Sequence, residues 1–266
     1  MKPITMLGLL YRLATPYALA VIATSPSLAA PVTFAQYTQE NGALQDWTIS
    51  SNGAQTTISA SGAVYFTFSG VSGLPFLGPQ SAIFTLSATT NQSGNCGVAC
   101  GNGDSFSQQG YSGRFSFIDT GSAPGTNLLS GVFAVTGSPA TTGAQFSSNV
   151  GSSGGSFVAS STAGNLSQLV LTSNYLVFAG QTDETASWSL SSLTPNFAVG
   201  TVIDGNAFPA GAFAAAGLGT FSSNPGPELA EPPTFGLLGS GLLGFGFLLA
   251  RKKSFAGKLP HLRNRI

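Results

Sequence analysis

The chain has 266 residues, of which only 7% are charged, and its nine basic and nine acidic residues balance. Between Ala30 and Thr234, however, nine acidic residues accompany a single basic residue, Arg114, which gives a formal charge of −8 (1 − 9). A single cation among nine acids cannot neutralise the phosphates of a nucleic acid, so nucleic-acid binding is excluded. The only histidine is His261, which excludes histidine-based nucleophilic catalysis in the same stretch.

The N-terminus has the order of a secretory signal. Lys2 and Arg12 precede a modest apolar stretch from Leu13 to Ala23, and Ser27-Leu28-Ala29 supplies small residues for a signal peptidase. We expect residues 1–29 to be a signal peptide that is cut between Ala29 and Ala30. An uncleaved N-terminal anchor is the alternative. Either reading predicts export.

The next 200 residues predict an all-β domain. Apolar residues alternate with Ser, Thr and Gly at period two, which is typical of half-buried strands, and no helical stripe interrupts them. We expect residues 30–223 to form one antiparallel β-sandwich, jelly-roll-like, with about ten or more strands. The clearest strands are Ala63 to Phe68, Ser81 to Leu86, Gly113 to Ile118, Gly131 to Thr136 and Ala186 to Ser191.

Two polar stretches, from Asn91 to Tyr111 and from Ser147 to Gly155, are expected to be excursions from the sandwich. The first contains the only two cysteines, Cys96 and Cys100. In an oxidising compartment this isolated pair should form a local disulfide. Two free thiols, or a metal or redox role, are the alternatives. We expect no metal and no cofactor.

Three groups of residues could serve carboxylate catalysis, calcium binding or sugar stacking, and each could instead have a purely structural role. Carboxylates could act in pairs as in glycosidases, and the candidates are Asp183, Glu184, Asp46, Asp104, Asp119 and Asp204. Asn102-Gly103-Asp104 and Asp204-Gly205-Asn206 have the oxygen-rich composition of calcium loops, although turns select the same residues. Trp47, Tyr65, Tyr111 and Trp188 could stack on sugars if they are exposed, but their strand pattern favours core packing.

The C-terminal end has three parts. Residues 224–234 are a proline-rich spacer that ends in Glu231-Pro232-Pro233-Thr234. Residues 235–250 carry no charge and would span roughly 24 Å as a helix, a little short of a ~30 Å hydrocarbon core. Arg251, Lys252 and Lys253 follow, and residues 251–266 contain basic but no acidic residues. The positive-inside rule therefore predicts a transmembrane helix with a cytoplasmic tail, and places the large domain outside.

This tail resembles the PEP-CTERM sorting signal of Gram-negative bacteria, over residues 230–253. Glu231 and Pro232 match the second and third positions of its Pro-Glu-Pro signature, Thr234 matches the hydroxyl residue that commonly follows, and Ala230 occupies the position of the first proline. The resemblance implies an exosortase-type membrane enzyme as partner, a transient membrane anchor, and a final location in the envelope or outside the cell. It also implies an association with exopolysaccharide or biofilm.

The sequence thus predicts a noncatalytic exported protein of the envelope or extracellular matrix. Two rivals remain, a carbohydrate-binding sandwich and a polysaccharide-active enzyme that uses carboxylates. An exposed Trp or Tyr in a cleft would favour the first rival. Two carboxyl groups within about 5 to 10 Å in a concave site would favour the second.

Overall fold

The computed structural model describes residues 30–230, except 43, 77, 98, 136–143, 162–166 and 182. The predicted signal peptide, with its cleavage site at Ala29, lies outside the described residues, as does everything from Glu231 onward. Within the described part of the chain all regular secondary structure is β-strand. No helix long and apolar enough to cross a membrane occurs in that part.

Fifteen strands form within the described residues, and every pairing among them is antiparallel. The strands are β1 (Val32–Gln39), β2 (Trp47–Ser51), β3 (Thr56–Phe68), β4 (Gln80–Thr90), β5 (Gly94–Asn95), β6 (Ser105–Asp119), β7 (Asn127–Val135), β8 (Ala144–Asn149), β9 (Gly155–Ser161), β10 (Ser167–Thr172), β11 (Leu176–Val177), β12 (Glu184–Thr194), β13 (Asn206–Ala207), β14 (Ala212–Ser223) and β15 (Glu228–Leu229). The expected all-β antiparallel class is confirmed.

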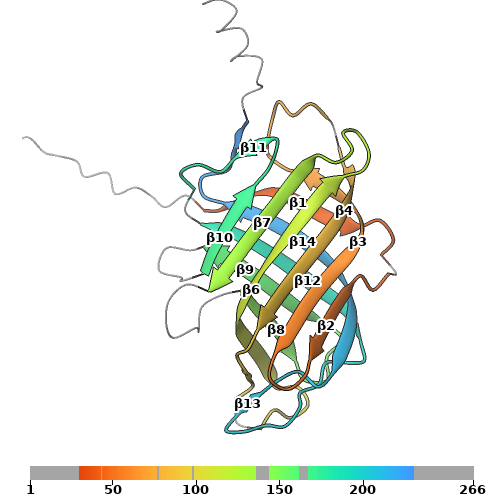
Figure 1. Ribbon diagram of the computed structural model, residues 1–266, viewed down its shortest axis with the longest axis vertical. Coiled ribbons are helices and arrows are strands. Elements are labelled where there is room, and N and C mark those ends of the chain that lie inside the picture. Colours follow the sequence, from red (N-terminus) through yellow and green to blue (C-terminus); the bar gives the residue numbers. More distant parts are fainter. Residues whose placement is uncertain are drawn as a thin grey trace, which may run out of the picture.

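The strands lie in two layers that cross in Figure 1. All strands except β11 and β15 belong to one continuous hydrogen-bonded sheet, which folds into these two layers. The strand pairings give the order β10-β7-β6-β4-β3-β2 in one layer and β8-β9-β12-β14-β1 in the other. Three strand pairings join the layers: β3 pairs with β1, β2 pairs with β14, and β6 pairs with β8. Strands that pass between layers form the corners of crossed sandwiches and enclose one core.

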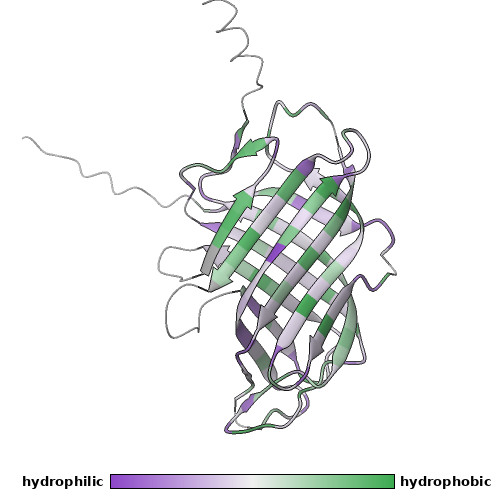
Figure 2. Cartoon of the chain, viewed as in Figure 1, coloured by the Kyte–Doolittle hydropathy of each residue, from purple (hydrophilic) through white to green (hydrophobic). Residues whose placement is uncertain are grey.

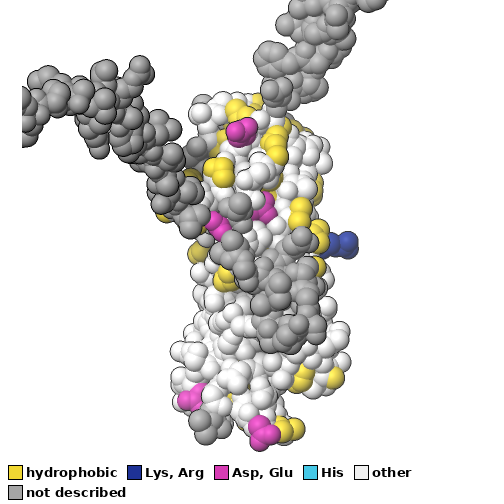
Figure 3. Space-filling model, turned by 90° about the vertical axis from the view of Figure 1, so that its left-hand side faces the viewer, with side chains coloured by type: hydrophobic (Ala, Val, Ile, Leu, Met, Phe, Trp, Pro, Cys, Tyr) yellow, Lys and Arg dark blue, Asp and Glu magenta, His cyan; other side chains and the backbone are white. Residues whose placement is uncertain are grey.

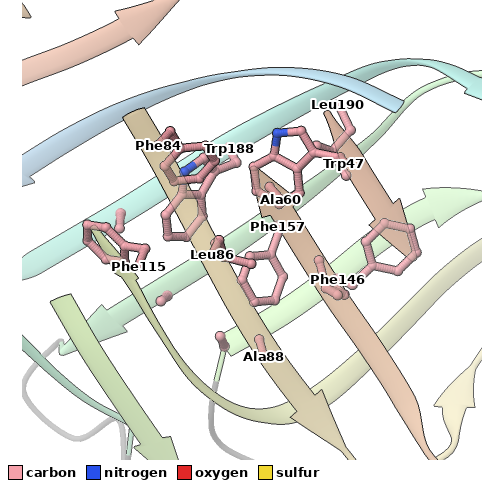
Figure 4. Close-up of a cluster of buried hydrophobic side chains, with 14 of the residues drawn as sticks. Trp47, Ala60, Phe84, Leu86, Ala88, Phe115, Phe146, Phe157, Trp188 and Leu190 are labelled. Atoms are coloured by element: carbon pink, nitrogen blue, oxygen red, sulfur yellow. The ribbon is translucent and has the colours of Figure 1, made fainter. Parts of the chain in front are cut away.

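Aromatic side chains fill the space between the layers. Along most strands residues of higher and lower hydropathy alternate (Figure 2), and the buried hydrophobic residues form one core cluster. Some large hydrophobic residues, Val132 and Val170 among them, are exposed on the outer face. Trp47 from β2 and Trp188 from β12 meet edge to face with ring centroids 6.1 Å apart, and Phe84 and Phe115 pack beside them (Figure 4). Both indoles are 0% exposed. Rings in such geometry stabilise a core beyond the area that they bury.

Two glycines of β14 make room for these rings. An added Cβ at Gly219 would lie 2.6 Å from Cε1 of Tyr37 and 2.8 Å from Cδ1 of Trp188, and one at Gly217 would meet the Trp47 indole. Glycine inside a strand normally weakens it, and here it marks a close approach. The rings therefore pack directly on the backbone of β14.

The five clearest predicted strands fall within β3, β4, β6, β7 and β12, apart from Thr136, which is not described. The two polar stretches that were predicted to leave the sandwich, 91–111 and 147–155, include parts of strands, so the loops are shorter than expected. Strand β6 begins at Ser105, because Phe106 and Tyr111 are buried in the core and the Gln108 amide is satisfied. Gln108 Nε2 donates to Thr56 Oγ1 at 2.9 Å and its Oε1 accepts from Tyr111 Oη at 2.6 Å. Residues 147–155 likewise include the end of β8 and the first residue of β9.

The folded unit continues past residue 223, where the sequence placed its end. Strand β15 pairs with β11, with Leu229 opposite Leu176, and the Ala230 backbone N–H donates to the Tyr175 carbonyl at 2.8 Å. Ser223 Oγ donates to the Pro225 carbonyl at 2.9 Å. The expected spacer is thus attached to the domain up to Ala230.

Candidate functional site

Of the four aromatic residues considered for sugar stacking, three belong to the core. Trp47, Tyr111 and Trp188 are fully buried, whereas Tyr65 is 39% exposed on the outer face of β3. Tyr65 lines a shallow groove of about 440 Å³ together with Gln36, Thr38, Thr67 and Pro79. Its hydroxyl donates to Glu40 Oε1 at 3.1 Å. This bond, and then the negative charge of Glu40, raise the pKa of the Tyr65 phenol.

The outer face of the β10-β7-β6-β4-β3-β2 layer carries a line of hydroxyl groups across five strands. Each residue stands directly opposite the next in the strand register, and the members, here called the hydroxyl row, are Ser61, Thr85, Ser116, Ser130 and Thr172. Thr85 Oγ1 and Ser116 Oγ lie 2.8 Å apart and share a hydrogen bond. Neighbouring strands are roughly 4.8 Å apart, so the row is about 19 Å long.

Arg114 stands beside this row. It lies between Ser87 of β4 and Val132 of β7 in the register, with Ser116 two residues along its own strand. A hollow of about 380 Å³ opens here, because the serines around it are short while Arg114, Val132 and Val170 are long enough to form its walls. Val132 and Val170 are 57% and 53% exposed. We call the row, Arg114 and these two valines the Arg114 face.

No other cation occurs among residues 30–230. Eight carboxylates accompany Arg114 there, and none forms an ion pair with it in the described part of the chain. In Figure 3 the only dark-blue side chain projects from the surface beside hydrophobic side chains. Arg114 was counted from the sequence as an isolated charge. Its position between a hydroxyl row and an apolar pair depends on the strand register.

The loop of the two cysteines lies at one end of the sandwich. Cys96 and Cys100 are joined in a disulfide with Cα atoms 5.1 Å apart, and the Cys96 backbone N–H donates to the Gly205 carbonyl at 3.1 Å. Asp104 Oδ2 accepts from the Gly101 backbone N–H at 2.7 Å, which is turn chemistry. No group of three or more His, Cys, Asp or Glu residues in the described ranges could hold a metal ion.

The predicted carboxylates are distributed over several loops and strand ends. A second hollow of about 530 Å³, near β13, contains Asp204 as its one carboxylate, and the Arg114 hollow and the Tyr65 groove are lined by none. Asp46 accepts from Gln39 Nε2 at 3.0 Å. None of these three hollows therefore brings two carboxylates together. Asp183 and Glu184 lie at the start of β12 and line none of the three.

Asp119 holds a turn at the end of β6. Burial by itself would raise the pKa of its carboxyl group, but the backbone N–H groups of Gly121 and Ala123, at 2.6 and 2.9 Å, outweigh this and lower it. Ser122 Oγ also donates to it, at 2.9 Å. The residue is buried. A carboxylate that accepts several hydrogen bonds is a structural anchor of the turn.

Among the carboxyl groups of the described residues, only that of Glu184 has a raised pKa, of about 7, and the cause is burial. Below pH about 4.5 it is protonated in both the folded and the unfolded state. Between pH 4.5 and 7 only the unfolded state releases the proton, so the free energy of unfolding falls as pH rises. The full shift corresponds to about 3 kcal/mol. Glu184 is 7% exposed but is the first residue of β12, where solvent lies close to the strand end, so screening should reduce this to about 1–2 kcal/mol.

We therefore expect Glu184→Gln to unfold with a higher free energy than the wild type at pH 8, by about 1–2 kcal/mol, and with nearly the same free energy at pH 4.5. Urea titrations at pH 4.5, 6 and 8 measure this difference. Asp183→Asn, the neighbouring acid, is the matched control, and Asp119 titrates below this window. A wild type and a Glu184→Gln variant with parallel pH profiles would contradict the prediction.

The fold and its outer faces define an all-β sandwich with hydroxyl-covered surfaces. No protein-family model matches the chain, and no match was found among the curated proteins or the solved structures.

Proposed function

We propose that this chain is a noncatalytic exported protein of the cell envelope or extracellular matrix, sorted by its C-terminal segment and associated with exopolysaccharide. The observation that carries the proposal is the order of parts at the C-terminal end. The described residues of the sandwich reach Ala230, whose backbone N–H donates to the Tyr175 carbonyl at 2.8 Å. In the sequence, Glu231-Pro232-Pro233-Thr234, the uncharged residues 235–250 and Arg251 to Lys253 come next without a gap. This order, a signature followed by an uncharged segment and a basic end, is the one expected of a substrate for a membrane-embedded processing enzyme.

In this proposal the domain passes through the inner membrane with the signal peptide leading. Residues 235–250 then hold it in the membrane, and Arg251, Lys252 and Lys253 keep the tail on the cytoplasmic side. An exosortase-type enzyme cuts near Glu231 to Thr234 and frees the domain. Pro232 and Pro233 keep this stretch extended, which suits a protease cleft.

Replacing Glu231 and Pro232 by alanine should leave the domain in the membrane fraction of cells that contain an exosortase, while the wild type is released. The measurement is immunoblotting of membrane and released fractions, with mass analysis of the released C-terminus. Glu228→Ala is the matched control, because it removes an acid three residues earlier, in β15. Equal release of both forms, or retention of the wild type with its tail intact, would contradict the sorting role.

A carbohydrate-binding module is the second candidate, and the exposed Tyr65 groove favours it. An aromatic ring beside amide and hydroxyl groups is suited to a sugar, since it offers an apolar face and polar partners together. Glu40, bonded to the Tyr65 hydroxyl, makes this groove unfavourable for an anionic ligand. The groove therefore suits a neutral sugar.

A further inference from the structure

We propose that the Arg114 face binds an acidic polysaccharide, that is, one whose sugar units carry carboxylates. The inference rests on the proposed function for the setting in which such a polymer is met. It goes beyond the proposed function because it names the binding site, the class of ligand, and Arg114 as the residue that selects this ligand.

The ligand class follows from the three kinds of group that lie side by side. The hydroxyl row places polar oxygens at a regular cross-strand interval, over a length of about 19 Å. Ser130 Oγ donates to Asn127 Oδ1 at 2.7 Å and so offers a ligand its lone pairs. Val132 and Val170 lie opposite each other in the neighbouring row and offer an apolar surface. Arg114, between Ser87 and Val132, supplies the charge. A chain of sugar acids has repeating hydroxyls, apolar C–H faces and carboxylates, and so matches all three.

The surroundings of Arg114 leave its guanidinium open to a ligand. Its neighbours across the strands are Ser87 and Val132, and those along β6 are Ser112 and Ser116, so no acid adjoins it in the sheet. The carboxylates of the described residues lie at loops and strand ends. Asp46 is beside Gly62, next to Ser61 at the β3 end of the row, and repulsion from carboxylates more than about 8 Å away is screened at physiological ionic strength. A planar guanidinium binds a carboxylate through two parallel hydrogen bonds.

The opposite layer shows that hydroxyls alone do not define the site. Ser147, Ser156 and Ser189 also stand in register on the outer face of β8, β9 and β12, but the next residue in that line is Leu218, and no cation is present. A neutral polymer would bind either face with similar affinity. Only an acidic polymer distinguishes them, because only one face carries a positive charge.

The test measures binding of the full chain, purified in detergent, to immobilised polygalacturonate by biolayer interferometry. The comparison ligand is the same polymer after reduction of its carboxyl groups, which keeps the hydroxyls and removes the charge. We expect binding to the acidic polymer and at least tenfold weaker binding to the reduced one. Arg114→Gln should weaken binding to the acidic polymer about tenfold or more, and Arg114→Lys by less, because lysine is a point charge.

Matched double variants test the face. Ser116→Ala with Ser130→Ala should weaken binding several-fold, whereas Ser156→Ala with Ser189→Ala, the same chemistry on the opposite layer, should leave it unchanged. Circular dichroism and the unfolding temperature verify that each variant folds. Unchanged binding by Arg114→Gln, equal binding of the reduced polymer, or loss through Tyr65→Ala alone would overturn the proposal. Release from the membrane is a separate measurement, so failure of the sorting role would leave this binding result intact.

Discussion

Replacing Trp188 by alanine is expected to lower the free energy of unfolding by about 3–5 kcal/mol. Trp188 is fully buried and contacts Trp47, Phe115, Phe157 and Phe221, with ring centroids 5.2 to 6.1 Å apart. These rings come from strands of both layers, so the cavity would open where the layers meet. Urea unfolding of residues 30–230, followed by far-ultraviolet circular dichroism, measures the loss.

Two further variants show whether the loss of stability comes from the lost packing of the ring. One tests the polar indole N–H, and the other tests whether removal of any aromatic ring has the same effect. The Trp188 Nε1 atom has no hydrogen-bond partner among the described residues, so Trp188→Phe should cost clearly less than Trp188→Ala. Tyr65→Ala removes an aromatic ring from the surface and should cost about 1 kcal/mol or less. If Trp188→Ala costs no more than Tyr65→Ala, the aromatic cluster does not form the packed core described above.

Gly219→Ala is expected to destabilise the domain by about 2–3 kcal/mol, although only one methyl group is added. That methyl group would lie 2.6 Å from Tyr37 and 2.8 Å from Trp188, and both rings are fully buried and surrounded. The rings can give way only by moving into other aromatic neighbours. The measurement is the same urea titration, and Leu218→Ala, at a position 50% exposed on the same strand, is the control.

A double-mutant cycle with Trp188→Phe shows whether the clash with the Trp188 indole causes the destabilisation by Gly219→Ala. If the clash with the indole is responsible, Gly219→Ala should cost less in a Trp188→Phe background, because the smaller ring leaves space near β14. The two variants would then be non-additive by about 1 kcal/mol or more. Strictly additive costs would place the strain elsewhere, for example in the backbone of β14.

The strands could be predicted because alternation reports burial on one face. Phe115 and Phe117 alternate with Arg114 and Ser116, and this pattern is visible without a structure. The first half of β6 could not be predicted in the same way, since Gln108 is polar and yet buried. Its amide is satisfied by Thr56, 52 residues away. Only a long-range partner makes that burial acceptable.

The candidate site was only partly foreseeable. Tyr65 was considered together with Trp47, Tyr111 and Trp188, and the sequence could not tell which of the four is exposed. The hydroxyl row was not predicted, although its serines and threonines are plain in the strand sequences. A row across strands depends on register, and a shift of one residue would move each member to the opposite face of the sheet.

The sequence by itself determined that the domain is all-β, through period-two alternation, and that positive charge is confined to Arg114 within residues 30–230, through composition. The tertiary structure alone decided which residues are neighbours. Ser61 and Thr172 are 111 positions apart and belong to one line because four successive strand pairings align them. Periodicity is a local property of the chain, whereas register is fixed by packing of the whole core, including the rings that rest on Gly217 and Gly219.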